Sequence, residues 1–267
     1  MSVTTPGAVS RDKDAPALLA TAAEQAESTH SARGAGAAQV QVCNGGETRS
    51  SGPGRSAAAQ ESVRKHCPDI IAQLSTDGRA QEARPRAALE ARHAVAVDGL
   101  GQLQRHRPRD PASLRSGARR RHARQRRQPR GLSVRPAMLY NTADLEAERL
   151  IEPLPQGHLV FGVWRALRTR RNILECEVAK LHESHPGSTW TAAGIGRHRF
   201  EVEAWALEAE GHHRTRFENS IRLDRSTLPH SDATLVGRAA GMAAAGRGGP
   251  SAMAEQAPEI LGSRGPA

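Results

Sequence analysis

The 267-residue sequence has little lysine and little cysteine, and each scarcity excludes something. Its three lysines (Lys13, Lys65 and Lys180) stand against 35 arginines. A surface selected only for charge mixes both residues, so this ratio indicates either a need for guanidinium groups or a G+C-rich gene. The three cysteines are odd in number and widely spaced, which excludes a disulfide framework and favours a reducing compartment.

Large apolar side chains are also scarce. Hydrophobic residues make up 37% of the chain and aromatic residues 3%, while the net charge is +10. Low hydrophobicity combined with high net charge is typical of disordered chains. The longest strongly apolar stretch, near 159–164, is far too short to span a membrane, and residues 1–14 hold no apolar run of a secretory signal. We therefore expect an intracellular, cytoplasmic protein that is mostly disordered.

Composition divides the chain into four segments. Residues 1–104 are low-complexity sequence, predicted to be largely disordered, and 105–139 form an arginine-rich basic segment. Residues 140–224 contain every aromatic side chain and form the candidate folded module. Residues 225–267, rich in alanine and glycine, read as a flexible tail.

Residues 140–224 show the patterns expected of a small sheet. A capped helix is predicted after 141, and strands are predicted at 158–164, 172–181, 199–207 and 214–223, where polar and apolar residues alternate. The predicted fold class is a mostly disordered chain with at most one small β-rich (α+β) module, built on a short antiparallel sheet. Two further short helices are predicted, at 15–28 and at 231–245.

The arginine-rich segment is the feature of the sequence that most directly indicates a function. Residues 105–135 hold twelve arginines and one acidic residue. Such a run neutralises phosphates and releases counterions, which gives affinity for DNA or RNA without sequence specificity. The run has no aromatic side chain for base stacking, and a solvated, self-repelling linker is the alternative. The candidate contact residues are Arg119, Arg120, Arg121, Arg124, Arg126, Arg127 and Arg130.

Other motifs are incomplete. Cys176, His182 and His185, followed by His212 and His213, offer one cysteine where a structural zinc site needs paired ligands. The glycines at 194 and 196 lack the third glycine of a dinucleotide-binding loop. The sequence therefore predicts no catalytic residue, no cofactor and no metal site.

Three functional hypotheses remain. The favoured one is that the chain is a spurious reading frame of G+C-rich DNA with no selected function. The second is a non-enzymatic basic protein that binds nucleic acid through the arginine-rich segment, and the third is a small-ligand-binding or enzymatic module at 140–224. Because no complete catalytic motif is present, the chain is predicted not to be an enzyme, and its oligomeric state stays open.

Overall fold

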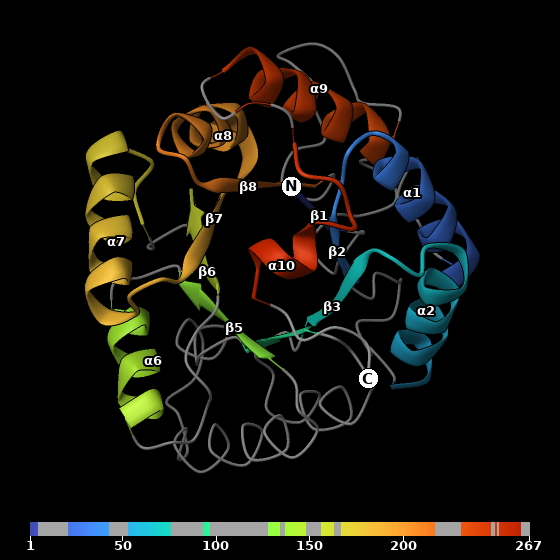
Figure 1. The fold of residues 1–267 in the computed structure, drawn as a ribbon, viewed down its shortest axis with the longest axis horizontal. Coiled ribbons are helices and arrows are strands. Elements are labelled where there is room, and N and C mark those ends of the chain that lie inside the picture. The colour runs from blue at the N-terminus through green and yellow to red at the C-terminus, as the bar shows by residue number, and fades with distance from the viewer. Residues whose placement is uncertain are drawn as a thin grey trace.

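Short runs of alternating residues form eight parallel strands, which close into a barrel in this computed structural model (Figure 1). The structure describes residues 1–4, 21–42, 53–75, 93–96, 128–133, 137–147, 156–162, 167–216, 231–246, 249 and 251–262. The strands are β1 (Ser2–Thr4), β2 (Gln39–Val42), β3 (Ile71–Ser75), β4 (His93–Ala96), β5 (Gln128–Ser133), β6 (Gln156–Phe161), β7 (Thr189–Gly194) and β8 (His212–Arg216). Each strand pairs in parallel with the next, and β1 pairs with β8 to close the ring.

Helices surround the barrel. They are α1 (Ala22–Gly34), α2 (Pro53–His66), α6 (Ala137–Ala147), α7 (Arg171–Ser184), the 3-10 helix η1 (Gly196–His198), α8 (Arg199–Glu208), α9 (Asp232–Ala245) and α10 (Ala257–Ile260). Local sequence fixes where two of them begin. The Thr21 hydroxyl accepts from the Glu24 backbone while the Glu24 carboxylate accepts from the Thr21 backbone, a capping box that starts α1. Ser231 caps α9 by accepting from the Thr234 backbone N–H at 3.2 Å.

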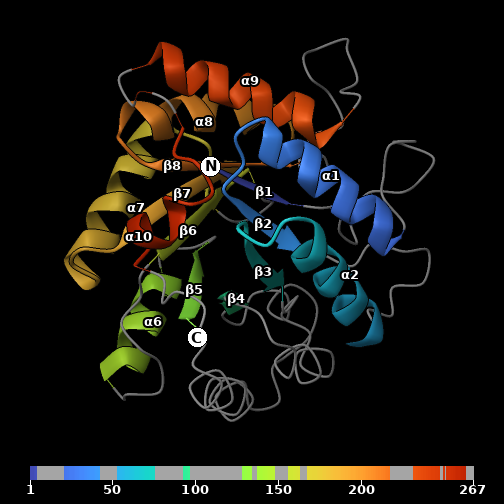
Figure 2. The ribbon, with the colours of Figure 1, turned by 45° about the vertical axis from the view of Figure 1, so that its right-hand side comes forward.

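The apolar core lies between the barrel and its helices. On one side, outward-facing Val3, Val40 and Val42 pack with residues of α1, α2 and α9. On the other side, Leu159 and Phe161 of β6 pack with residues of α6, α7 and α8. Figure 2 shows α1 and α2 on one flank and α7 and α8 on the opposite flank. α10 lies across one end of the barrel, where Ala257 and Leu261 contact Ala38 and Ile71 (Figure 1).

The predicted fold class is wrong. Segments expected to be disordered supply strands β1 to β5, and the sheet is parallel, not antiparallel. The composition gave the wrong prediction because many inward-facing positions of this barrel carry polar side chains, which a hydrophobicity count assigns to the surface. Alanines complete much of the packing between barrel and helices. One barrel thus draws on all of the segments from 1 to 224, and α9 and α10 follow it.

Two predicted strands are helices. The runs at 172–181 and 199–207 form α7 and α8. The buried residues of α8 are Arg199, Val202, Glu203 and Ala206, which is the spacing of one helix face. A buried arginine and a buried glutamate at two of these positions hid that spacing behind an accidental two-residue alternation.

The remaining predicted elements correspond to observed ones. The run at 158–164 overlaps β6, the helix after 141 overlaps α6, and the helix at 231–245 is α9. The run at 214–223 begins inside β8, and the helix at 15–28 overlaps α1, which begins later. Among the described residues, no helix combines the length and the apolar character needed to cross a membrane.

Candidate functional site

The lumen of the barrel is polar. Strand register places alternate residues inside, so Gln41 stands beside Thr4 on one neighbouring strand and beside Gln73 on the other. The buried polar side chains on these inward positions are Ser2, Thr4, Gln39, Gln41, Gln73, Gln156, His158, Thr191 and Arg214. Bulky branched residues ordinarily fill such a lumen. A polar filling is costly unless it is hydrogen-bonded, and its presence indicates a functional interior.

Three of these side chains form a hydrogen-bonded cluster around a buried cation. Arg214 Nη1 donates to Gln41 Oε1 at 2.6 Å and lies 3.2 Å from His158 Nδ1. Arginine has no acceptor, so His158 Nδ1 must accept here, which fixes the tautomer of this ring with its proton on Nε2. Arg214 is 4% exposed, and it is the third residue of its strand, as Gln41 and His158 are of theirs. The cluster therefore holds a permanent positive charge in the middle of the lumen.

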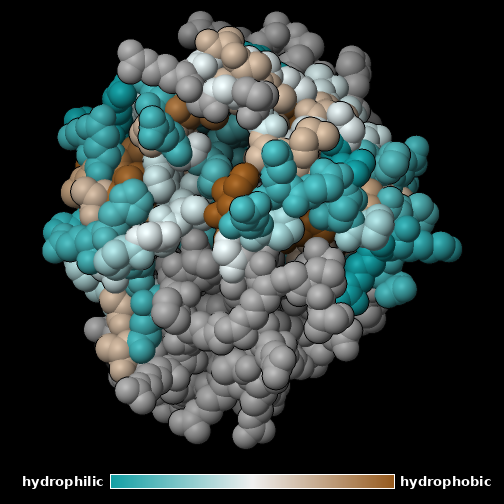
Figure 3. Space-filling view, in the orientation of Figure 1, coloured by the Kyte–Doolittle hydropathy of each residue, from teal (hydrophilic) through white to brown (hydrophobic). Residues whose placement is uncertain are grey.

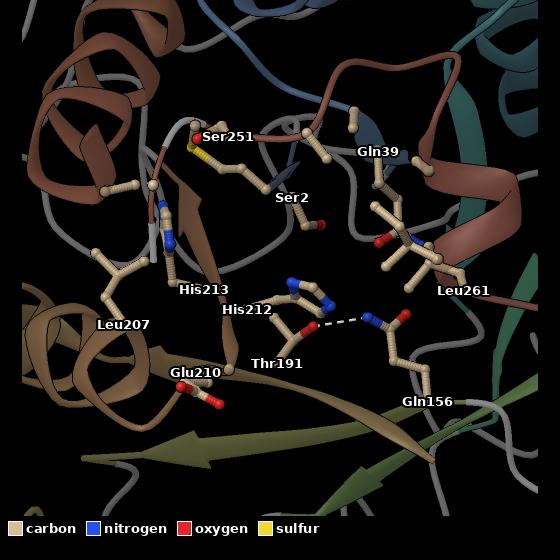
Figure 4. Close-up of a pocket in the computed structure, with 18 residues that line it drawn as sticks. Ser2, Gln39, Gln156, Thr191, Leu207, Glu210, His212, His213, Ser251 and Leu261 are labelled. Carbon is tan, nitrogen blue, oxygen red and sulfur yellow. Dashed lines mark hydrogen bonds between the residues drawn. The ribbon is translucent and has the colours of Figure 1, made fainter. Parts of the chain in front are cut away.

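A second polar layer lies nearer the amino ends of the strands. Gln156 Nε2 donates to the Thr191 hydroxyl at 2.8 Å, and Gln39 Nε2 donates to Gln73 Oε1 at 3.5 Å. Gln39, Gln156 and His212 are the first residues of β2, β6 and β8. This layer borders a cavity of about 380 Å³ that is covered by the C-terminal segment (Figure 4).

The two ends of the barrel differ in whether catalytic residues are expected there. Reactions in parallel barrels of this kind occur at the carboxyl ends of the strands, on loops that follow them. Of those loops, the described residues include the turn after β7, where Gly194 packs so closely that a Cβ there would lie 2.5 Å from the His198 carbonyl oxygen. Thr4 ends β1 on this side, fully buried. On β6 and β7 the inward positions nearer the carboxyl ends are Val160 and Ala193, so the Arg214 cluster lies one layer deeper in the lumen.

Two strongly shifted pKa values lie outside the lumen. Burial raises the pKa of Glu203 to about 7, against the opposing effects of Arg199 and a hydrogen bond with Thr215. Burial also lowers the pKa of His213 to about 3, so this ring is neutral. His213 and Thr215 alternate with Arg214 on β8 and therefore face away from the lumen. Both groups belong to the packing of α8 and α9 on the barrel, and neither supplies the lumen with a proton.

The residues weighed as a metal site are not brought together. Cys176 is exposed on α7, while His185 Nδ1 lies 3.0 Å from a Glu146 carboxylate oxygen. His212 and His213 point to opposite faces of β8. Across the described segments, no group of three or more histidine, cysteine or acidic side chains is arranged to hold a metal ion.

Most of the predicted nucleic-acid contacts lie outside the described residues: Arg119, Arg120, Arg121, Arg124, Arg126 and Arg127. Arg130 is in β5, paired with Val95 of β4. Contact with DNA or RNA stays an untested prediction.

Sequence reasoning missed Gln41, His158 and Arg214. A signal did exist: Gln39-Val40-Gln41-Val42 alternates perfectly, although it lies in the segment 1–104 that composition predicts to be largely disordered.

Comparisons with known proteins agree on one family. The family model described as beta-keto acid cleavage enzyme matches residues 1–262. The 3-oxoadipate:acetyl-CoA acetyltransferase of Cupriavidus necator is 34% identical over 282 residues, covering 98% of this chain and 94% of that protein. The 3-keto-5-aminohexanoate cleavage enzyme of Fusobacterium nucleatum is 46% identical over 59 residues, 22% of each chain.

A structural comparison supports the fold. A complex of ObcA with oxaloacetate has a TM-score of 0.76 at 17% identity, covering 93% of this chain and 68% of that one. Together these findings overturn three interpretations: that the chain is a spurious reading frame, that it is a disordered nucleic-acid-binding protein, and that it is not an enzyme. The chain belongs to the beta-keto acid cleavage enzyme family.

Proposed function

We propose that this protein cleaves a β-keto acid in a reaction coupled to acetyl-CoA, with the substrate carboxylate held by Arg214. The observation that carries the proposal is the buried cation in the barrel lumen, hydrogen-bonded to Gln41 and His158. The family match and the name of the Cupriavidus necator relative supply the reaction class.

The chemistry of the substrate explains why a cation is needed. A β-keto acid bears a carboxylate two carbons from a ketone, and cleavage breaks the bond between carbons 2 and 3. The electron pair of that bond stays on carbon 2, next to a carboxylate that is already negative. A guanidinium bound to this carboxylate spreads and stabilises the growing charge, and it does so strongly because the surroundings are buried.

The coupling to acetyl-CoA balances the reaction. The acyl half of the keto acid ends on the CoA sulfur, and the acetyl group ends on carbon 2 of the carboxylate fragment. One carbon–carbon bond breaks and one forms, and one thioester is exchanged for another. No oxidant or reductant is required. A proton leaves carbon 2 before it attacks the acetyl thioester and returns after the old carbon–carbon bond breaks, so besides this proton transfer the chain has to bind, orient and stabilise charge.

Gln41 and His158 have a positioning role. Each contacts the same nitrogen, Nη1 of Arg214, from a different strand. This restrains the rotation of a long side chain and leaves the planar guanidinium oriented before substrate arrives. Because the donor is already oriented, no free energy is needed to order it at the moment of reaction.

The test is a product assay with the purified full-length chain. Incubated with 3-oxoadipate and acetyl-CoA, it should form a new acyl-CoA and a new β-keto acid in equal amounts, measured by mass spectrometry. The control is 2-oxoadipate, whose ketone is adjacent to the carboxylate and should not be cleaved. Failure to exchange any thioester across a panel of β-keto acids would refute the proposal.

A further inference from the structure

Strand β1 lies between β8 and β2, and its inward side chains are the small hydroxyl residues Ser2 and Thr4, because Val3 faces the helices. We infer that Thr4 is a substrate-binding residue, whose hydroxyl donates a hydrogen bond to the carboxylate held by Arg214. The inference rests on the proposed function, since it concerns the same site. It adds to that site a contact from a strand that the Arg214 cluster does not include.

The hydrogen bond from Arg214 to Gln41 crosses the inner face of β1. The strands that carry these residues, β8 and β2, are two strand spacings apart, about 10 Å, because β1 separates them. The two side chains nevertheless meet at 2.6 Å. Along β1, Ser2 is in register with Arg214, and Thr4 is in register with Gln41. The guanidinium group therefore lies over β1, next to the side chains of Ser2 and Thr4.

Both hydroxyls of β1 are buried beside this cation without a hydrogen-bond partner among the described residues. Thr4 is 0% exposed and Ser2 is 3% exposed. A buried hydroxyl without a partner costs free energy in the unliganded protein, and a ligand that supplies an acceptor recovers it. Arginine has no acceptor to offer either O–H group. A carboxylate bound to the guanidinium does, because its two oxygens have more acceptor positions than the arginine occupies.

Thr4 is on the side of the guanidinium from which a substrate arrives. It is the last residue of β1, and reactions in barrels of this kind occur at the carboxyl ends of the strands. At the inward positions nearer those ends, the other described side chains are Val160 and Ala193, which cannot donate a hydrogen bond. Among the described side chains of the lumen, Thr4 is therefore the donor that meets the carboxylate from that side.

Ser2 belongs to the opposite end of the lumen. It lines the cavity of about 380 Å³ at the amino ends of the strands, whereas neither Thr4 nor any of the three residues of the Arg214 cluster does. Figure 1 shows α10 lying across this end, and Figure 3 shows the hydrophobic surface over α10 on the same face. The two hydroxyls of β1 thus flank one guanidinium from opposite ends of the barrel, and Thr4 is the one on the side of the carboxyl ends.

Isothermal titration of 3-oxoadipate into the full-length protein and its variants, without acetyl-CoA, tests this contact. Thr4→Val keeps the shape of the side chain and removes the hydroxyl, so it should bind about tenfold or more weakly, the value of a hydrogen bond to a charged group. Thr4→Ser keeps the hydroxyl and should recover most of that affinity. Ser2→Ala should weaken binding less than Thr4→Val does.

Thermal unfolding separates a binding role of the Thr4 hydroxyl from a structural one. Because valine replaces a buried hydroxyl that has no described partner, Thr4→Val should unfold at the same temperature as the parent or higher. Thr29→Val is the matched control, since the Thr29 hydroxyl is also buried but donates to the Gln25 carbonyl oxygen at 2.7 Å on α1. That variant should lose stability and keep its affinity for 3-oxoadipate. A lower unfolding temperature of Thr4→Val with unchanged affinity would assign the hydroxyl a structural role and overturn the inference.

The outcomes distinguish this inference from the proposed function. Equal affinities of the parent and Thr4→Val, with weaker binding by Arg214→Gln, would overturn the assignment of Thr4 alone. A larger loss of affinity in Ser2→Ala than in Thr4→Val would also overturn it and place the carboxylate toward the amino ends. Absence of thioester exchange in the parent would refute the proposed function, and absence of any 3-oxoadipate binding by the parent would refute both.

Discussion

The inner and outer faces of the barrel use neighbouring residues for opposite purposes. On β6, His158 faces inward and contacts Arg214, while Leu159 faces outward and packs against the helices. On β2, Gln41 faces inward and Val40 outward. The outer face is apolar and holds the helices to the sheet, whereas the inner face is polar and holds a buried charge. The difference predicts that substitutions on a single strand, one residue apart, affect stability or activity separately.

The largest expected effect is on activity, from Arg214→Gln. Loss of the buried cation should lower kcat/KM for β-keto acid cleavage about 100- to 1000-fold, the usual cost of removing one preorganised donor to developing charge. The midpoint of thermal unfolding should change little. Arg64→Gln, an exposed arginine at the end of α2, is the control and should leave kcat/KM unchanged. Comparable losses of kcat/KM in both variants would show that the effect is not specific to the arginine inside the barrel.

Leu159→Ala should show the opposite pattern. Leu159 is fully buried in the outer cluster, so its truncation leaves a cavity and should lower the free energy of unfolding by about 3 kcal/mol. The specific activity of the folded protein should be preserved. Denaturant unfolding measures the loss, and Ile173→Ala, only partly buried against the same cluster, should cost less. A large drop in kcat/KM without a stability change would mean that the outward face serves catalysis.

Glu203→Gln tests the buried carboxyl on the outer side of β8. The pKa of Glu203 is raised from 4.5 to about 7, so between these pH values the folded protein binds more protons than the unfolded chain. The free energy of unfolding contributed by this group therefore falls as pH rises from about 4.5 through about 7. The variant should be more stable than the parent by about 3 kcal/mol at pH 8 and nearly equal at pH 4. Glu201→Gln, exposed on the same helix, should show no such difference between pH 4 and pH 8.

The smallest effect is expected from Gln41→Ala. Arg214 keeps its charge but loses the acceptor at 2.6 Å, so kcat/KM should fall about five- to tenfold, a loss of about 1 kcal/mol. The neighbouring variant Val40→Ala should reduce stability and leave activity per folded molecule intact. Steady-state kinetics on both variants check this, and equal activities for the two would show that Gln41 does not position the arginine.

Part of this fold could be predicted from the sequence. A short helix was predicted at 231–245, where α9 forms, and the apolar run at 158–164 predicted β6. The alternation in 39–42 was also present, but it lies in a segment predicted to be disordered, because glutamine at inward positions looks like surface. The parallel pairing of the strands could not be predicted from the sequence, because strands as far apart in the chain as β1 and β8 become neighbours only when the barrel closes.

The candidate site was harder to predict than the fold. Gln41, His158 and Arg214 are separated by more than a hundred residues in places, as the 173-residue interval between Gln41 and Arg214 shows. No local motif links them, and the conspicuous arginine run drew attention to a different part of the chain. Only the pairing of β6, β7 and β8, with β8 returning to β1 and β2, brings the three side chains together.

The central claim is that the polar lumen binds the substrate carboxylate through Arg214. Isothermal titration of 3-oxoadipate into the parent protein and into Arg214→Gln tests it most directly, without acetyl-CoA and without turnover. A hydrogen-bonded contact with a charged partner is worth about 1.5–3 kcal/mol, so the variant should bind at least about tenfold more weakly. Equal affinities in the two proteins would contradict the account and place the carboxylate elsewhere.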